Sequence, residues 1–218
     1  MIQIRSALAD DTDFLGWVIL TAARGHRERG WFDVVLQQDE AFCVEYCRKL
    51  AGAATPSWWH WSLFSVAVVD DQRAAALCGF GDPSLYAASS AAMAEASQKM
   101  GLSEDEHSQL WPRGAFILSC ATSEENAWTI ENMATLPEYR GTDVTRALLN
   151  GEFERARGAG YSRAQISFFV GNQTAERAYI KAGFKFAEEK RSPEFQAALG
   201  VPGLRRFARN IASSDLQQ

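Results

Sequence analysis

Residues 140–145, Arg-Gly-Thr-Asp-Val-Thr, form a basic glycine turn between a strand-like and a helix-like stretch. Before the turn, residues 128–136 alternate with a two-residue period until Pro137 ends the pattern. After it, Val144 and Leu148 recur with helical spacing. A turn of this kind presents free backbone N–H groups and the positive end of a helix dipole. We therefore expect residues 140–145 to bind a phosphate group.

A second candidate for chemistry is Tyr179, within Asn172-Gln-Thr-Ala-Glu-Arg-Ala-Tyr-Ile-Lys-Ala-Gly-Phe184. The segment predicts a short helix, because Asn172 can cap its start and Gly183 can end it in the left-handed conformation. A strand-like stretch, 161–170, precedes it. A phenol with a pKa of about 10 stays protonated at neutral pH and can donate a proton to a thiolate. Alternatively, Tyr179 packs on Phe184 beside a Schellman end, and both roles can hold together.

The two segments together resemble the GNAT acetyltransferase superfamily. The later segment matches a family pattern at six positions, which are Asn172, Ala175, Tyr179, Lys181, Gly183 and Phe184. The turn at 140–145 is similar to the family's pyrophosphate-binding turn, Arg-Gly-x-Gly-x-Gly/Ala. The resemblance implies an α/β (α+β) fold with a central mixed, mostly antiparallel, splayed sheet flanked by helices, in one domain over 1–218. It also implies an N-acetyltransferase that uses acetyl-CoA as co-substrate and a primary amine of a small molecule or another acceptor.

The resemblance assigns roles to individual residues. It places Tyr179 at the general-acid position and gives a strand-edge N–H the task of polarising the acetyl carbonyl. Glu131 is the candidate base and is expected on the same strand face as Thr129 and Met133; an ordinary strand-face glutamate and proton removal by water remain open. The residues expected to contact the cofactor are Met133, Ala134, Thr135, Leu136, Arg140, Gly141, Thr142, Asp143, Val144, Thr145, Asn172 and Ala175.

Two positions of the turn depart from the family pattern. Asp143 stands where the second glycine is usual, and Thr145 stands at the Gly/Ala position. A side chain there obstructs the close approach of a phosphate, and a carboxylate adds negative charge beside it. Asp143 can instead serve as a helix cap. The departure motivates an alternative, a catalytically inactive GNAT-fold protein that binds an acyl-CoA or another ligand or acts through protein contacts. A third hypothesis is that the chain is an unrelated α/β enzyme, which has only the helix of Tyr179 in common with the family.

The acceptor side is expected from aromatic residues in the N-terminal half. Trp31 and Phe32 are the candidates for substrate contact, and the cluster Trp58-Trp59-His60-Trp61 is a further one, although aromatics this numerous more often belong to core or edge packing. Residues 82–114 read as a helical insertion between the third and fourth strands. A helix is predicted over 87–100, and Ser103 begins another with capping-box spacing. This insertion either covers the acceptor site or pads the sheet, and the sequence favours padding.

The remaining periodicity predicts the order of elements. A strand is expected over 2–5, a helix from about 10 to 23, a loop at 30–33, and a helix capped by Asp39 that ends near Leu50. Strands at 62–69 and 74–80 form a hairpin. Residues 115–121 are left unassigned, and the family resemblance places a final strand within 192–211.

Composition excludes several classes of protein. The formal net charge of −5 argues against a nucleic-acid binder, and no apolar run is long enough to predict a membrane span or a signal peptide. The four cysteines are too few and scattered for a disulfide scaffold, and Cys43 and Cys47 lack the further ligands of a metal site. We therefore expect a cytoplasmic protein without a metal; family habit implies a homodimer.

Overall fold

A seven-stranded sheet runs through residues 1–212, the part of the chain that this computed structural model describes. Its strand order is β1-β2-β3-β4-β5-β7-β6, and all neighbours are antiparallel except β4 and β5. The strands are β1 Ile2–Ser6, β2 Phe64–Val69, β3 Gln72–Phe80, β4 Trp128–Thr135, β5 Arg163–Phe169, β6 Lys185–Arg191 and β7 Gly203–Asn210. The expected mixed, mostly antiparallel sheet is therefore confirmed.

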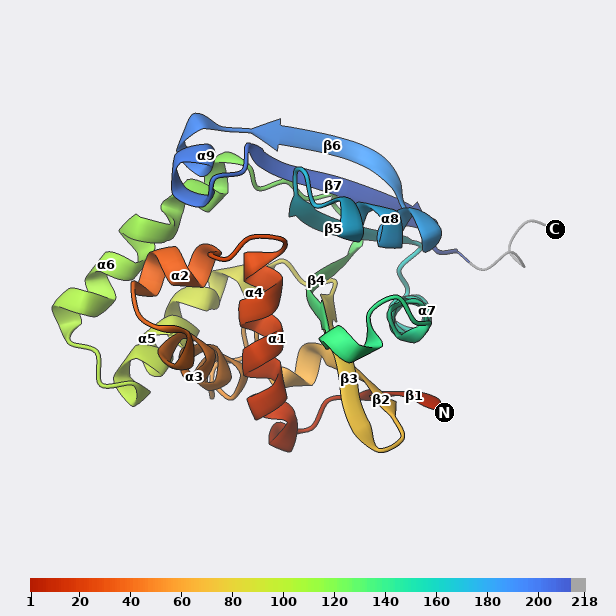
Figure 1. The fold of residues 1–218 in the computed structure, drawn as a ribbon, viewed down its shortest axis with the longest axis horizontal. Helices are drawn as coiled ribbons and strands as arrows, with labels where there is room; N and C mark the ends of the chain where they lie inside the picture. The colour runs from red at the N-terminus through yellow and green to blue at the C-terminus, as the bar shows by residue number, and fades with distance from the viewer. Residues whose placement is uncertain (213–218) are drawn as a thin grey trace.

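The sheet opens between its two parallel strands. β4 and β5 pair only over Trp128–Ile130, after which the strands diverge. In Figure 1, β5, β7 and β6 form the upper half and β1–β3 the lower half, with β4 between them. Beyond Ile130, the edge of β4 that faces β5 therefore has no strand to pair with, and its backbone groups are available to a ligand.

A bulge interrupts β4 just past this point. Between the pairs Ala76↔Ala134 and Cys78↔Glu131, two residues of β4 oppose one of β3, and Asn132 takes a φ of +47°. The extra residue changes which face the following side chains occupy. Met133 packs against the apolar cluster that holds α7, whereas Glu131 lies beside Cys78 on the other face. The expectation that Glu131 and Met133 share a face is therefore wrong.

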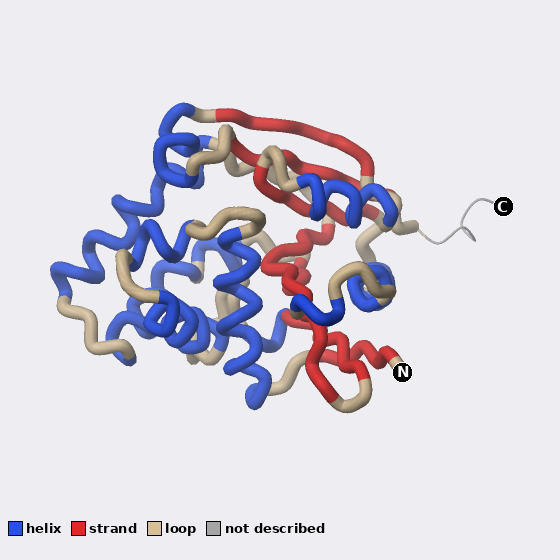
Figure 2. The backbone as a smooth tube through the Cα atoms, viewed as in Figure 1, coloured by secondary structure: helices blue, strands red, loops and turns tan. Residues whose placement is uncertain are grey.

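Helices cover both faces of the half-sheet β1–β4. The helices of the described chain are α1 Thr12–Arg24, α2 Trp31–Leu36, α3 Glu40–Ala51, α4 Ser84–Ala87, α5 Ser89–Lys99, α6 Glu104–Gly114, α7 Val144–Gly158, α8 Gln173–Lys181 and α9 Pro193–Leu199. Of these, α8 packs instead on β5 and β7, and α9 packs on residues 115–119. Figures 1 and 2 show α1–α6 gathered to one side of the strands and α7 on the other. No helix of residues 1–212 has the length and apolar character that a membrane crossing requires.

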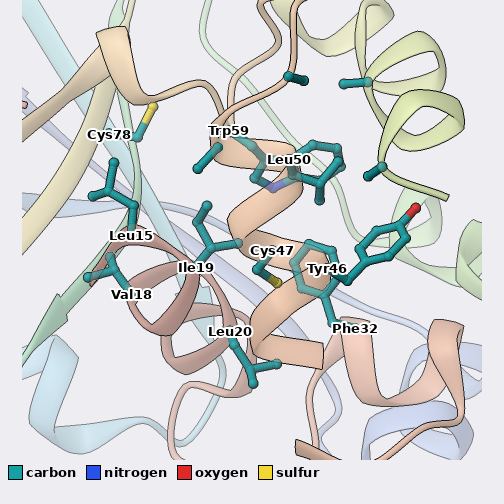
Figure 3. Close-up of a cluster of buried hydrophobic side chains, with 14 of the residues drawn as sticks. Leu15, Val18, Ile19, Leu20, Phe32, Tyr46, Cys47, Leu50, Trp59 and Cys78 are labelled. Atoms are coloured by element: carbon teal, nitrogen blue, oxygen red, sulfur yellow. The ribbon is translucent and has the colours of Figure 1, made fainter. Parts of the chain in front are cut away.

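The largest apolar cluster joins α1, α2 and α3 to the sheet. Figure 3 shows Leu15, Ile19, Phe32 and Tyr46 within it, together with Trp59. The loop expected at 30–33 is wrong, because α2 starts there. The carboxylate of Asp33 accepts the backbone N–H of Gly30 at 2.7 Å, a local capping bond that residue spacing alone does not distinguish from a turn. Asp39 caps α3 as predicted, accepting from the N–H of Phe42.

The segment after β5 follows its local signals closely. Asn172 Oδ1 accepts the N–H of Ala175 at 3.2 Å and starts α8. Gly183 has a φ of +81°, and the N–H of Phe184 bonds the carbonyl of Tyr179 at 3.0 Å, so α8 ends in the predicted Schellman motif. The final strand is confirmed as β7, while α9 within 192–202 is an element that the sequence did not predict.

The insertion between β3 and β4 consists of α4, α5 and α6. The helix predicted over 87–100 is confirmed as α5, which the short helix α4 precedes. The capping box of Ser103 and Glu106 at the start of α6 is also confirmed. The insertion is tied to the N-terminal core, because the Tyr46 hydroxyl donates to the carbonyl of Met93 at 3.1 Å. Residues 115–119, left unassigned from the sequence, form a short 3-10 helix.

Candidate active site

The divergence of β4 and β5 opens a cleft of about 2070 Å³. One end lies at the turn 140–145 and the first turn of α8. The other end lies among aromatic side chains of α2, the segment 58–59 and the insertion. β4 and β5 form the walls between the two ends. The splayed sheet thus joins the predicted phosphate-binding turn to the predicted acceptor side in a single cavity.

The turn end of the cleft offers backbone donors. Gly141 has a φ of +80° with open space around its Cα, and α7 begins at Val144. The N–H groups of Gly141, Asp143, Thr145 and Arg146 make no hydrogen bond to another residue within 1–212. They lie at the positive end of the α7 dipole, where an anion is stabilised. The turn therefore retains the donor set that a diphosphate needs.

Asp143 leaves these donors free. It occupies the N-cap position of α7, but its carboxylate makes no capping bond and instead pairs with Arg146 at 2.9 Å. The interpretation of Asp143 as a side-chain cap is therefore wrong. The hydroxyl of Thr145 also turns away from the backbone donors, since its Oγ1 lies 3.1 Å from Oγ1 of Thr135 on β4. Neither departure from the family pattern blocks the turn by bonding to it.

Glu131 is half-buried on β4 and lines the cleft. The hydroxyl of Tyr86, on α4, donates to its Oε1 at 3.2 Å. Within the described chain Glu131 has no cationic partner, so burial dominates and raises the pKa of its carboxyl to about 7; the hydrogen bond from Tyr86 opposes this shift. A carboxylate with this pKa is divided between its protonated and ionised forms at neutral pH, which is the condition for a general base.

Asn132, next to Glu131, is a residue whose role the sequence did not predict. It is buried at the bulge and lines the cleft, and its Nδ2 has no hydrogen-bond partner among residues 1–212. Buried amides are nearly always satisfied, so an unpaired one facing a cavity indicates a polar atom of a ligand. An asparagine inside an alternating strand was the available signal, because asparagine is rare in strands and tolerates a positive φ.

Tyr179 faces the same cleft from α8. Its ring packs edge-on against Phe168 and Phe184, with centroids 5.3 and 6.1 Å away. Its hydroxyl makes no hydrogen bond to a described residue. Burial, reinforced by the negative charge of Glu131, raises the pKa of the phenol further above its usual value. The tyrosine is thus protonated at neutral pH and both packs and points a donor into the cavity, as the sequence allowed.

The aromatic end of the cleft, the predicted acceptor side, is lined largely by the insertion. Tyr86, Met93, His107 and Trp111 line it together with Trp31 and Phe32 of α2. The indole N–H of Trp31 donates to the carbonyl of Gly114 at 3.0 Å, which fixes α2 against α6. The interpretation of the insertion as padding is therefore wrong. The insertion lines the cleft and packs on α2 and α3 instead of covering an edge of the sheet. The packing of α5 on α3 is a tertiary contact that the sequence pattern does not show.

Most of the predicted site residues converge on the cleft. Two do not line it: Leu136 packs toward the α1 side, with its N–H bonded to Ala74, and Val144 is buried beneath α7. The other predicted contacts, from Met133 to Thr135, through the turn and to Asn172 and Ala175, line the cavity. Within residues 1–212, no group of three or more His, Cys, Asp or Glu side chains is placed to hold a metal ion.

Comparison with solved structures shows where this architecture recurs. An N-acetyltransferase from Staphylococcus aureus Mu50 superposes with a TM-score of 0.67 at 14% identity, covering 94% of this chain and 99% of that one. A Drosophila melanogaster polyamine N-acetyltransferase, which forms N-acetylagmatine, has a TM-score of 0.57 at 14% identity, with 96% and 100% covered. The Salmonella typhimurium protein yncA, solved with its cofactor acetyl-CoA, has a TM-score of 0.56 at 13% identity, with 97% and 95% covered.

Sequence comparison adds the family. No curated protein matches the chain in sequence. The model of the acetyltransferase (GNAT) family, in contrast, matches residues 23–184, which are well over half of the chain. That range includes β4, the turn at 140–145, β5 and α8, the elements that form the cleft. Together with the splayed mixed sheet, this match shows that the chain belongs to the acetyltransferase (GNAT) family.

Proposed function

We propose that the protein is an N-acetyltransferase that moves the acetyl group of acetyl-CoA to a primary amine of a small molecule. The observation that carries the proposal is the position of Glu131. A carboxyl with a pKa of about 7 lies in the wall of a cleft that has a set of phosphate-binding donors at one end and an apolar chamber at the other. Membership of the family supports the same assignment.

In the proposed complex, the pyrophosphate of acetyl-CoA lies on the free N–H groups of Gly141, Asp143, Thr145 and Arg146. The pantetheine arm follows the unpaired edge of β4 beyond Ile130. Asn172 and Ala175, at the start of α8, flank the arm on the β5 side. This path brings the thioester to the middle of the cleft, between Glu131 and Tyr179.

The chemistry then follows from the two side chains. Glu131 accepts a proton from the ammonium form of the acceptor and passes it to water. The freed nitrogen attacks the acetyl carbonyl, whose oxygen is stabilised by backbone donors of β4. As the new N–C bond forms and the C–S bond breaks, the Tyr179 phenol gives its proton to the departing thiolate. The second proton lost by nitrogen restores the phenol, so the products are the amide, CoA thiol and one proton in solution.

Calorimetric titration with acetyl-CoA at fixed salt tests the first half of the proposal. Micromolar affinity supports a working pyrophosphate turn despite Asp143. Release of CoA thiol upon addition of primary amines then tests the second half. Acetyl-CoA binding without turnover of any amine would favour the alternative hypothesis instead. That alternative, motivated by Asp143 and Thr145, is a protein of this fold that binds acyl-CoA without catalysis.

A further inference from the structure

The acceptor end of the cleft is walled by a connected row of aromatic rings. Trp58 lies 5.3 Å from Tyr86 and 4.7 Å from Trp59, and Trp59 lies 6.2 Å from Trp31, measured between ring centroids. Because Tyr86 also holds Glu131, the row begins at the candidate base. Such walls favour flat apolar ligands, which gain stacking and edge contacts as well as burial.

Two of these rings are held before any ligand arrives. The indole N–H of Trp58 donates to Ser89 Oγ at 2.9 Å, and that of Trp31 donates to the carbonyl of Gly114. Trp111 and Leu118, at the mouth, remain 51% and 62% exposed. Large apolar groups left exposed around a cavity mark a surface that a ligand covers. The chamber thus offers fixed ring faces and an apolar rim.

The charges in the cleft limit what the ligand carries. Among the described residues that line it, carboxylates come from Glu131, Asp143 and Glu188. Asp143 pairs with Arg146 at 2.9 Å and Glu188 with Arg206 at 3.3 Å, so Glu131 alone is left without a cation. The lining arginines and lysines belong to the turn, α7, α8 and β6; the described aromatic end contributes none. A second cation on the acceptor would therefore be desolvated there without a further carboxylate beside it. A carboxylate would have no Lys or Arg beside it, but groups such as the ring of His107 and the indole of Trp59, whose N–H is unpaired within the described chain.

We propose that the acceptor is a primary monoamine carried on a flat aromatic body, with its ring in the chamber of Trp31, Trp58 and Trp59 and its amine at Glu131. This inference rests on the proposed function and narrows it. It separates this chain from the neighbour that acetylates agmatine, whose substrate carries a guanidinium in addition to the amine. The distinction comes from the single uncompensated carboxylate on the aromatic side.

A matched panel of amines tests the substrate class. 2-Phenylethylamine is compared with phenylalanine, which adds a carboxylate, with n-butylamine, which lacks the ring, and with 1,4-diaminobutane and agmatine, which add a second cation. We expect kcat/KM for 2-phenylethylamine to exceed each of the others by at least about tenfold. Equal or faster turnover of the diamine or agmatine would overturn the inference while leaving an N-acetyltransferase.

A second measurement keeps ligand class and catalysis apart. Four tryptophans line the cleft, namely Trp31, Trp58, Trp59 and Trp111, so titration of the acetyl-CoA complex with 2-phenylethylamine should change the intrinsic fluorescence. Binding without turnover would contradict the proposed enzymatic activity and support the proposed ligand class. The absence of both binding and turnover would contradict both proposals. Trp58→Leu should lower kcat/KM for 2-phenylethylamine about tenfold more than it lowers kcat/KM for n-butylamine; an equal loss for both amines would overturn the stacking role. Trp17→Leu is the matched control for folding, because Trp17 is partly buried on α1 and does not line the cleft.

Discussion

The hydroxyl of Tyr86 on α4 donates to Oε1 of Glu131 on β4 at 3.2 Å, which joins the helical insertion to the strand that carries the candidate base. The ring of Tyr86 in turn packs on Trp58 and Phe80, 5.3 and 5.2 Å away. A segment added between two strands therefore lowers the pKa of Glu131 against the effect of burial and also lines the aromatic end of the cleft. Changes in the insertion are expected to alter both specificity and pH dependence.

Glu131→Gln should remove the base and keep the shape of the site. Because only the ionised carboxylate accepts a proton, wild-type kcat/KM should rise with pH and level off above about pH 7. In the variant we expect kcat/KM to fall by roughly 10²–10⁴-fold and the acid limb to disappear. The affinity for acetyl-CoA is the control and should not change. An acid limb that persists in the variant would assign proton removal to another group or to water.

The same substitution should change how stability depends on pH. The folded pKa of Glu131, about 7, lies above its ordinary value of 4.5, so between these values the folded protein holds a proton that the unfolded chain has lost. The contribution of Glu131 to the free energy of unfolding is therefore fully present below about pH 4.5 and is lost as pH rises through about 7. Denaturant unfolding is measured below about pH 4.5 and above about pH 7. Between these conditions the unfolding free energy of wild type should fall by on the order of 2–3 kcal/mol more than that of Glu131→Gln.

Tyr86→Phe isolates the hydrogen bond to Glu131, since the ring and its packing remain. That bond lowers the pKa of the carboxyl against the effect of burial. Its loss should therefore move the acid limb of the kcat/KM profile to higher pH, with acetyl-CoA affinity unchanged. Tyr161→Phe serves as the matched control, because Tyr161 packs on Trp128 and does not line the cleft. A profile that shifts equally in both variants would exclude a specific role for Tyr86.

Tyr179→Phe tests the general acid. The edge-on contacts with Phe168 and Phe184 persist without the hydroxyl, so stability and acetyl-CoA affinity should stay close to wild type. We expect kcat to fall by about 10²–10⁴-fold, the usual range for a lost proton donor. Single-turnover measurement of thiol release follows this step directly. Unchanged turnover would remove Tyr179 from the mechanism and leave it a packing residue.

The site elements that the sequence predicted are those fixed by neighbouring residues. Asn172 and Gly183 set both ends of α8 through bonds within the segment, and Gly141 sets the turn before α7 through its own φ. Alternation was enough to place β4. Each of these signals involves residues only a few positions apart, so it can be recognised from a short segment of the sequence.

The features that escaped prediction depend on residues far apart in the chain. The bulge at Asn132 exists relative to the register of β3, and it decides that Glu131 and Met133 face opposite sides. Tyr86 meets Glu131 across 45 residues of sequence, in an insertion that is held to α3 by the bond between Tyr46 and Met93. Neither relationship is encoded in the spacing of one segment, because each requires the tertiary packing of two.

Asp143→Gly decides how far the altered turn weakens cofactor binding. The Asp143 side chain is 71% exposed, pairs with Arg146 at 2.9 Å and bonds none of the turn's N–H groups. Its remaining influence is a solvent-screened charge, so we expect the Kd for acetyl-CoA to change by less than about threefold. Arg146→Ala is the comparison, because it leaves Asp143 uncompensated beside the diphosphate. It should weaken binding more, and affinity should fall less steeply with salt because one attractive charge is lost. An affinity gain of tenfold or more in Asp143→Gly, about 1.4 kcal/mol, would show instead that the native aspartate suppresses the site.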